Sequence, residues 1–148
     1  SNTIADGFKI AEILKKRYRN HYNTLTTFNT FFKYKDDKAH LEYSCKLIEL
    51  DDNKKIQQIR YNNRTEVIPY ANPLEISRYV EARSKFWQLI KNPLNNIKIK
   101  QKSGDMLILD NYRVLHGRSE YTEINNRRYF RQGYMDRDIF LSKLKTIN

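Results

Sequence analysis

Short apolar segments separated by turn residues make up the last third of the chain, and this spacing most constrains the fold. Strands are predicted near 97–100, 106–109, 113–116 and 129–134. Lys102-Ser103-Gly104-Asp105 has the composition of a turn, and Asn92-Pro93 ends the long amphipathic segment 73–91, which is predicted to be a helix. Short strands between such turns favour antiparallel pairing. The sequence therefore predicts an α+β chain of antiparallel strands with inserted helices.

The first half of the chain also contains sequence signals for both helices and strands. Asp6 is placed to cap a helix over 6–17, and a shorter helix is predicted over 20–25. The remaining signals are for strands, predicted over 28–34, 45–50 and 56–61. Asp36-Asp37-Lys38 and Asp51-Asp52-Asn53 are predicted to be turns between them.

Length and composition narrow the class of protein. A chain of 148 residues without internal repeats predicts one domain, and no apolar run reaches the roughly 18 residues that a membrane span needs. The start lacks a methionine and a signal-peptide pattern, so we expect either the interior of a longer protein or the start of a truncated one. Cys45 is the only cysteine, which excludes an internal disulfide and favours the reducing cytoplasm.

The net charge of +11 comes from 28 Lys and Arg against 17 Asp and Glu. Such an excess is compatible with nucleic-acid binding, but the charges are scattered along the chain. Attraction of small anionic substrates is the more economical interpretation. Nucleic-acid binding is therefore kept only as a weak alternative.

His116 is the first candidate site residue. It follows the apolar pair Val114-Leu115, so its imidazole is expected at the end of a buried strand. Iron(II) oxygenases hold their metal with two histidines and one carboxylate on a single face. The other reading is a surface or satisfied core histidine. His40-Leu41-Glu42 also has the His-x-acid form, but it lies in a polar, loop-like segment and is dismissed as an iron site.

Arg128 lies twelve residues after His116, at the start of the strand predicted over 129–134. A guanidinium group grips a carboxylate with two parallel hydrogen bonds, which suits the far end of an oxo acid that chelates a metal. In a strand, Arg128, Gln132 and Tyr134 share one face, whereas Arg127 points away. Alternatively, these arginines lie on a solvated sheet surface.

Three further residues are candidates for substrate binding. Tyr134 is either core packing or a cation–π partner for a quaternary ammonium group. Asn62 and Asn63 are either turn residues or amides that orient a carboxylate.

Taken together, these segments closely resemble the gamma-butyrobetaine and trimethyllysine dioxygenase family, which depends on iron(II) and 2-oxoglutarate. The resemblance runs along nearly the whole chain, and its matching segments are 4–12, 47–51, 59–64, 103–106, 111–118 and 133–138. Asn111-x-Arg113-Val114-Leu115-His116-Gly117-Arg118 is the most specific of them. The whole chain, 1–148, is thus identified as the C-terminal portion of a single catalytic domain of this type.

The resemblance implies a double-stranded β-helix (jelly-roll) with helical inserts, present in part, and often a homodimer. It implies that His116 is an iron ligand, that Arg128 binds the remote carboxylate of 2-oxoglutarate, and that no catalytic side chain exists beyond the metal site. Tyr134 would lie near the trimethylammonium group of the substrate, and Asn63, or less favourably Asn62, in its pocket. The implied reaction is hydroxylation of a C–H bond, with 2-oxoglutarate converted to succinate.

One departure from the family shapes the expected activity. The family's His-x-Asp pair lies before the point where this sequence begins, so we expect the isolated chain to be inactive. The alternative is a non-catalytic remnant that associates with itself through open strand edges or binds small anions.

Overall fold

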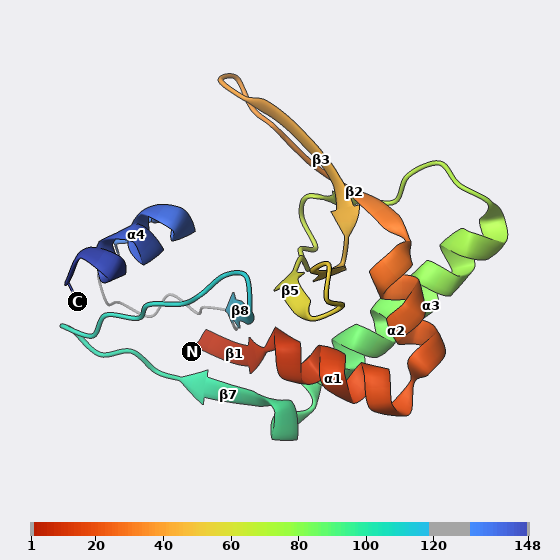
Figure 1. Ribbon diagram of the computed structural model, residues 1–148. Coiled ribbons are helices and arrows are strands. Elements are labelled where there is room, and N and C mark those ends of the chain that lie inside the picture. Colours follow the sequence, from red (N-terminus) through yellow and green to blue (C-terminus); the bar gives the residue numbers. More distant parts are fainter. Residues whose placement is uncertain (1, 119–130, 148) are drawn as a thin grey trace, which may run out of the picture.

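The computed structural model describes residues 2–118 and 131–147 of the chain (Figure 1). Its helices are α1 (Gly7–Arg17), α2 (Arg19–Thr27), α3 (Pro73–Lys91), α4 (Arg137–Ile147) and the short 3₁₀ helix η1 (Pro93–Asn95). Its strands are β1 (Asn2–Asp6), β2 (Asn29–Lys35), β3 (His40–Lys46), β4 (Ile48–Leu50), β5 (Ile56–Ile59), β6 (Glu66–Val67), β7 (Asn96–Ile99) and β8 (Val114–Arg118). This mixture of helices and antiparallel strands confirms the predicted α+β class.

The core of the molecule lies where α1, α2 and α3 pack against one another and against the β4–β5 hairpin (Figure 1). Fully buried side chains repeat at helical spacing along each helix, with Ile10 and Leu14 on α1 and Tyr79 and Phe86 on α3. Burial of such side chains from water is the main stabilising force. Asp6 caps α1 as predicted, because its carboxylate accepts hydrogen bonds from two backbone N–H groups of the first turn.

A three-stranded antiparallel sheet with the order β7-β1-β8 joins the first strand of the chain to two strands from its last third. Ala5 lies opposite Leu115, and Ile4 lies opposite both Ile97 and His116. Paired residues in antiparallel strands share a face of the sheet. Ala5 is buried and Leu115 packs against the core, so Ile4, Ile97 and His116 lie on the other face, which we call the open face.

Two further antiparallel units complete the described strands. The β4–β5 hairpin forms across 51–55 as predicted, and β2 pairs with β3 on one side and with β6 on the other. The β2–β3 pair extends away from the helices as a two-stranded arm (Figure 1). The turn predicted at Asp36 is confirmed, since its carboxylate accepts hydrogen bonds from Lys38 N and Ala39 N.

Three segments differ from their sequence-based assignment. The segment 40–44 is part of a strand and not a loop, because all seven residues of His40–Lys46 pair with β2, and the strand predicted over 45–50 is divided between β3 and β4. Residues 106–109 are not a strand, and the side chains of Met106 and Ile108 are 82% and 73% exposed. Residues 131–134 also lack regular structure, and the rest of that predicted strand lies outside the described residues.

The larger architecture is only partly determined by these elements. The described strands form three small sheets, and the predicted double-stranded β-helix (jelly-roll) stays a prediction. Across 2–118 and 131–147, no helix is both long enough and apolar enough to cross a bilayer.

Candidate functional site

His116 lies near the middle of β8, on the open face of the β7-β1-β8 sheet. His116 thus lies within the strand and not at its end, where the sequence predicts it, and its side chain is exposed. The physical reason is the alternation of the strand, because Leu115 occupies the core-facing position and therefore turns His116 outward. The imidazole thus projects from a rigid strand into space that the described residues leave uncovered.

The described residues supply few further groups for a metal. In residues 2–118 and 131–147 there is no cluster of three or more His, Cys, Asp or Glu side chains that could hold an ion. His40 and Glu42, the dismissed pair, interact with each other on the exposed arm, where His40 Nε2 and Glu42 Oε1 are 3.2 Å apart. Iron(II) sites of oxygenases use three protein ligands. The described part of the chain therefore presents one imidazole at the open face, which is less than a complete iron site.

An ion pair fixes the position at which β8 begins. Arg113 donates from Nη2 to Asp6 Oδ2 at 2.6 Å and from Nε to Asp6 Oδ1 at 3.1 Å. This hydrogen-bonded guanidinium lowers the pKa of Asp6 below its usual range, although partial burial opposes the shift. Gly7 N donates to Arg113 O at 2.9 Å in the same place. Arg113 is therefore a structural anchor for the strand that carries His116, and not a loose surface charge.

Of the two site residues predicted beyond β8, the structure describes Tyr134 but not Arg128. Arg128, the predicted 2-oxoglutarate ligand, and its alternative Arg127 lie outside the described residues. Tyr134 is 80% exposed, and its hydroxyl accepts a hydrogen bond from Gln132 Nε2 at 2.6 Å. Among the described residues Tyr134 is therefore not part of the core, and its place beside a substrate cation stays a prediction.

Asn62 and Asn63 follow β5 and have different partners. Asn62 Oδ1 accepts hydrogen bonds from Arg64 N at 2.7 Å and Thr65 N at 3.4 Å, so it closes a turn. Asn63 Oδ1 accepts a hydrogen bond from Arg83 Nη2 at 2.8 Å. The turn interpretation is thus confirmed for Asn62, and Asn63 belongs to a larger polar network.

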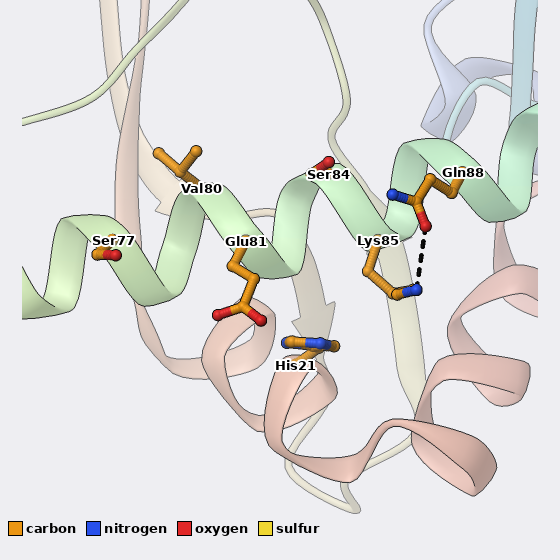
Figure 2. Close-up of a pocket in the computed structure, with 7 residues that line it drawn as sticks. All are labelled: His21, Ser77, Val80, Glu81, Ser84, Lys85 and Gln88. Atoms are coloured by element: carbon orange, nitrogen blue, oxygen red, sulfur yellow. Dashed lines mark hydrogen bonds between the residues drawn. The ribbon is translucent and has the colours of Figure 1, made fainter.

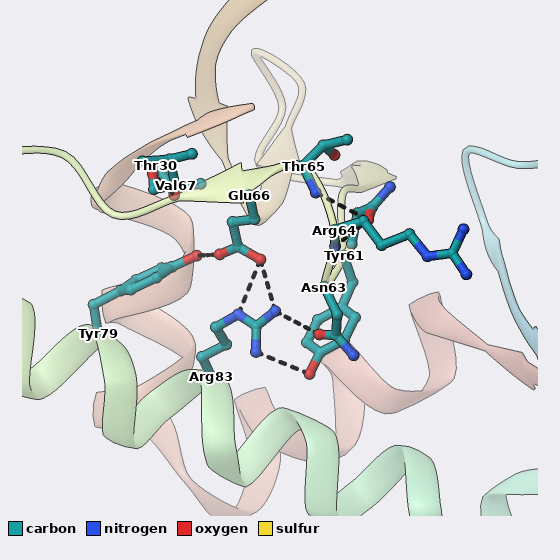
Figure 3. A network of polar contacts seen from close by, with 10 residues as sticks. Thr30, Tyr61, Asn63, Arg64, Thr65, Glu66, Val67, Tyr79 and Arg83 are labelled. Carbon is teal, nitrogen blue, oxygen red and sulfur yellow. Dashed lines mark hydrogen bonds and ion pairs between the residues drawn. The ribbon is translucent and has the colours of Figure 1, made fainter. Parts of the chain in front are cut away.

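That network is centred on Arg83 and Glu66 (Figure 3). The Glu66 carboxylate is 4% exposed and accepts hydrogen bonds from Arg83 and from the hydroxyl of Tyr79. Burial and this carboxylate together raise the pKa of Tyr79. Sequence reasoning missed the network, although its signal was present: Tyr79 and Arg83 are four residues apart, so an arginine shares the buried face of α3.

A shallow groove of about 700 Å³ lies between α2 and α3 (Figure 2). Its lining is mostly polar and consists of His21, Ser77, Val80, Glu81, Ser84, Lys85 and Gln88. Lys85 Nζ is already bonded to Gln88 Oε1 at 3.0 Å. No predicted site residue lines the groove, so the candidate site remains the open face with His116 and the segment around Asn63.

The chain is similar to known dioxygenases along most of its length. The chain is 28% identical to trimethyllysine dioxygenase of Meyerozyma guilliermondii over 100% of its own length and 38% of that protein. It is 31% identical to gamma-butyrobetaine dioxygenase of Homo sapiens and 30% identical to that of a Pseudomonas species, in both cases over 97% of its own length and 38% of the relative. The chain therefore spans well under half the length of these relatives, as the interpretation as a C-terminal portion requires. A model of the taurine catabolism dioxygenase TauD, TfdA family matches residues 1–134, and the chain belongs to this family.

Proposed function

We propose that this chain is the C-terminal part of an iron(II)- and 2-oxoglutarate-dependent dioxygenase that hydroxylates a small trimethylammonium carboxylate such as gamma-butyrobetaine. The observation that carries the proposal is the family match over residues 1–134, which includes His116 on the open face. The names of the relatives, trimethyllysine dioxygenase and gamma-butyrobetaine dioxygenase, support the class of substrate.

In this proposal the residues of the chain bind and orient the reactants. His116 holds the iron, Arg128 binds the remote carboxylate of 2-oxoglutarate, Tyr134 faces the trimethylammonium group and Asn63 faces the carboxylate of the substrate. Iron bound together with 2-oxoglutarate supplies the oxidation of the C–H bond. Since one imidazole is too few for a stable iron(II) site, two further ligands must come from outside the described residues.

The proposal also includes expectations about the activity of the isolated chain, its oligomeric state and its location. The 148-residue chain by itself is expected to be inactive, because its described residues bring one metal ligand. The full catalytic unit is expected to be a homodimer, as the resemblance implies. A cytoplasmic location accords with Cys45, whose thiol is free and buried.

The test is formation of succinate from 2-oxoglutarate by the natural polypeptide that carries these residues, with gamma-butyrobetaine and with trimethyllysine as substrates. We expect turnover that needs iron(II) and is stimulated by one of the two compounds. His116→Ala and Arg128→Ala should each abolish it. His21→Ala is the matched control, because His21 lies in the groove between α2 and α3 and should be dispensable. Turnover that survives loss of His116, or that needs no iron, would contradict the proposal.

One observation favours the alternative of a self-associating remnant. Ile97 on the open face is 60% exposed, and Met106 and Ile108 leave more apolar surface uncovered nearby in the sequence. Exposed apolar side chains that gather into one contiguous patch commonly mark interaction surfaces. A natural polypeptide that shows no turnover with either compound, yet sediments as a defined oligomer, would establish this alternative.

A further inference from the structure

We propose that Arg83 is a positioning residue, which holds the side chain of Asn63 so that its NH₂ group, and not its oxygen, faces the carboxylate of a bound substrate. The proposal rests on the proposed function for the identity of the ligand. The orientation of the amide rests on contacts among described residues alone (Figure 3).

Each of the three nitrogens of the Arg83 guanidinium group has a partner. Nε donates to Glu66 Oε2 at 2.9 Å, Nη2 forms an ion pair with the same oxygen at 2.8 Å, and Nη1 donates to the hydroxyl of Tyr61 at 3.1 Å. Nη2 also donates to Asn63 Oδ1 at 2.8 Å. One planar group thus connects α3 to the acidic residue of β6 and to two residues of the segment after β5.

This guanidinium is itself held firmly in place. The Glu66 carboxylate is almost fully buried, so the ion pair is little weakened by solvent. The guanidinium also lies over the ring of Tyr61, with 4.4 Å from its central carbon to the ring centroid. Tyr61 in turn stacks on Phe86 and Trp87 of the same helix. Arg83 therefore presents its hydrogen-bond donor to Asn63 from a fixed position.

The chemistry of arginine then determines which way the amide turns. A guanidinium group has five N–H donors and no acceptor, so the atom of Asn63 that faces it must be the carbonyl oxygen. The NH₂ group is left on the other side, and within the described residues it has no hydrogen-bond partner. Asn63 is exposed, so this donor is available to a ligand that brings an acceptor.

Asn62 shows by contrast that this orientation is not a property of the segment as a whole. The oxygen of Asn62 is occupied by backbone N–H groups of its own turn, and among the described residues no side chain of α3 forms a hydrogen bond with it. Only Asn63 is fixed from α3. Of the two asparagines predicted as substrate ligands, the structure assigns the oriented donor to Asn63.

The test is anaerobic calorimetry of the natural polypeptide with iron(II) and 2-oxoglutarate present, titrated with gamma-butyrobetaine or trimethyllysine, whichever the wild type binds more tightly. A second titration uses the corresponding compound without its carboxylate. Arg83→Lys keeps a positive charge for Glu66 but cannot maintain the four contacts of the planar group. We expect the Kd for the carboxylate ligand to rise about tenfold, as for loss of one hydrogen bond to a charged group. The Kd for the compound without a carboxylate should not change.

Two further variants distinguish positioning from a purely structural role. Asn63→Asp keeps an acceptor for Arg83 but replaces the NH₂ group by a negative oxygen, so it should weaken only the carboxylate ligand, by about tenfold or more. In an Asn63→Ala background, adding Arg83→Lys should have no further effect on the Kd of the carboxylate ligand. For Arg83→Lys alone, kcat at saturating substrate should stay near the wild-type value. Arg78→Lys, on the exposed face of α3, is the matched control.

The outcomes separate this inference from the proposed function. If the wild type binds neither compound in the presence of iron, both the proposed function and the ligand of Asn63 are overturned. If the wild type binds one of them and Arg83→Lys weakens both ligands equally, or weakens neither, only the positioning role of Arg83 is overturned. Additive effects of the Arg83 and Asn63 variants would also overturn it.

Discussion

Asp6 and Arg113, which are 107 residues apart in the chain, meet through two hydrogen-bonded oxygens of a single carboxylate. The same carboxylate also accepts hydrogen bonds from Phe8 N and Lys9 N at the start of α1. One side chain therefore caps a helix and at the same time anchors the residue that precedes β8. Two kinds of stabilisation depend on it.

Asp6→Ala should lower the free energy of unfolding by about 1 kcal/mol or somewhat more, because it removes the helix cap together with the ion pair. The folded-state pKa of Asp6 is lowered, so its contribution is fully present above the ordinary carboxyl pKa and is lost as pH falls through the folded-state value. Urea unfolding at pH 7 and at pH 3 measures this. The difference from wild type should shrink at pH 3, and Asp52→Ala, in an exposed turn, should show little effect at either pH.

Gly7→Ala should destabilise the protein although alanine is the better helix former. A Cβ atom at this position would lie 2.8 Å from the backbone oxygen of Arg113 and 3.0 Å from Ile59 Cγ1. The backbone oxygen cannot move without shifting β8, so we expect a loss of about 1–3 kcal/mol in chemical denaturation. Gly133→Ala is the control, since its added Cβ meets no atom within 4 Å. Equal stability of the two variants would show that α1 and β8 are less closely packed than described.

Tyr79→Phe removes one hydroxyl from a fully buried ring and leaves the Glu66 carboxylate with one hydrogen bond fewer. Because the lost bond involves a charged acceptor, unfolding should become easier by about 1.5 kcal/mol or more. Thermal or urea unfolding measures the change, with Tyr70→Phe as the control on a fully exposed tyrosine. If Tyr79→Phe left the free energy of unfolding unchanged, hydrogen bonding from Arg83 alone would be enough for the Glu66 carboxylate.

Ile97→Lys should change the free energy of unfolding by no more than about 0.5 kcal/mol, since this side chain lies on the open face and not in the core. If copies of the chain associate through that face, the variant should shift the sedimentation profile towards monomer. Ile90→Lys is the contrasting variant, because Ile90 is buried and a charge there should prevent folding. An unchanged profile for a self-associating wild type would place the interface elsewhere.

The helices were well predicted from the sequence because their signals are local. The helix predicted over 73–91 has those same bounds in the structure, with Asn72 as its cap and Pro73 in its first turn. The helix predicted over 6–17 begins directly after Asp6 for the same kind of reason. A cap, a first-turn residue and an apolar repeat all lie within one short window, so no distant partner is needed to identify them.

Strands and site contacts were harder to predict because each depends on a partner elsewhere in the chain. The segment 40–44 is polar enough to look like a loop, yet pairing with β2 makes it part of a strand. Met106 to Leu109 has strand composition, but no described strand pairs with it. Arg83 was overlooked as one more charge on a helix, since only the folded chain brings Glu66 and Asn63 to it. His116 was placed on the correct strand, but its face is set by register and not by composition.

The central place of β1 in its sheet has a consequence for how the molecule is made. β1 spans residues 2–6, yet the strands on either side of it are β7 and β8, which emerge during synthesis only after more than ninety residues have been added. Contacts of such large sequence separation form slowly, because a long loop must be closed before any pairing energy is gained. The helices can begin to assemble while the ribosome is still extending the chain, whereas the strand that carries His116 is added to its sheet among the last steps of folding.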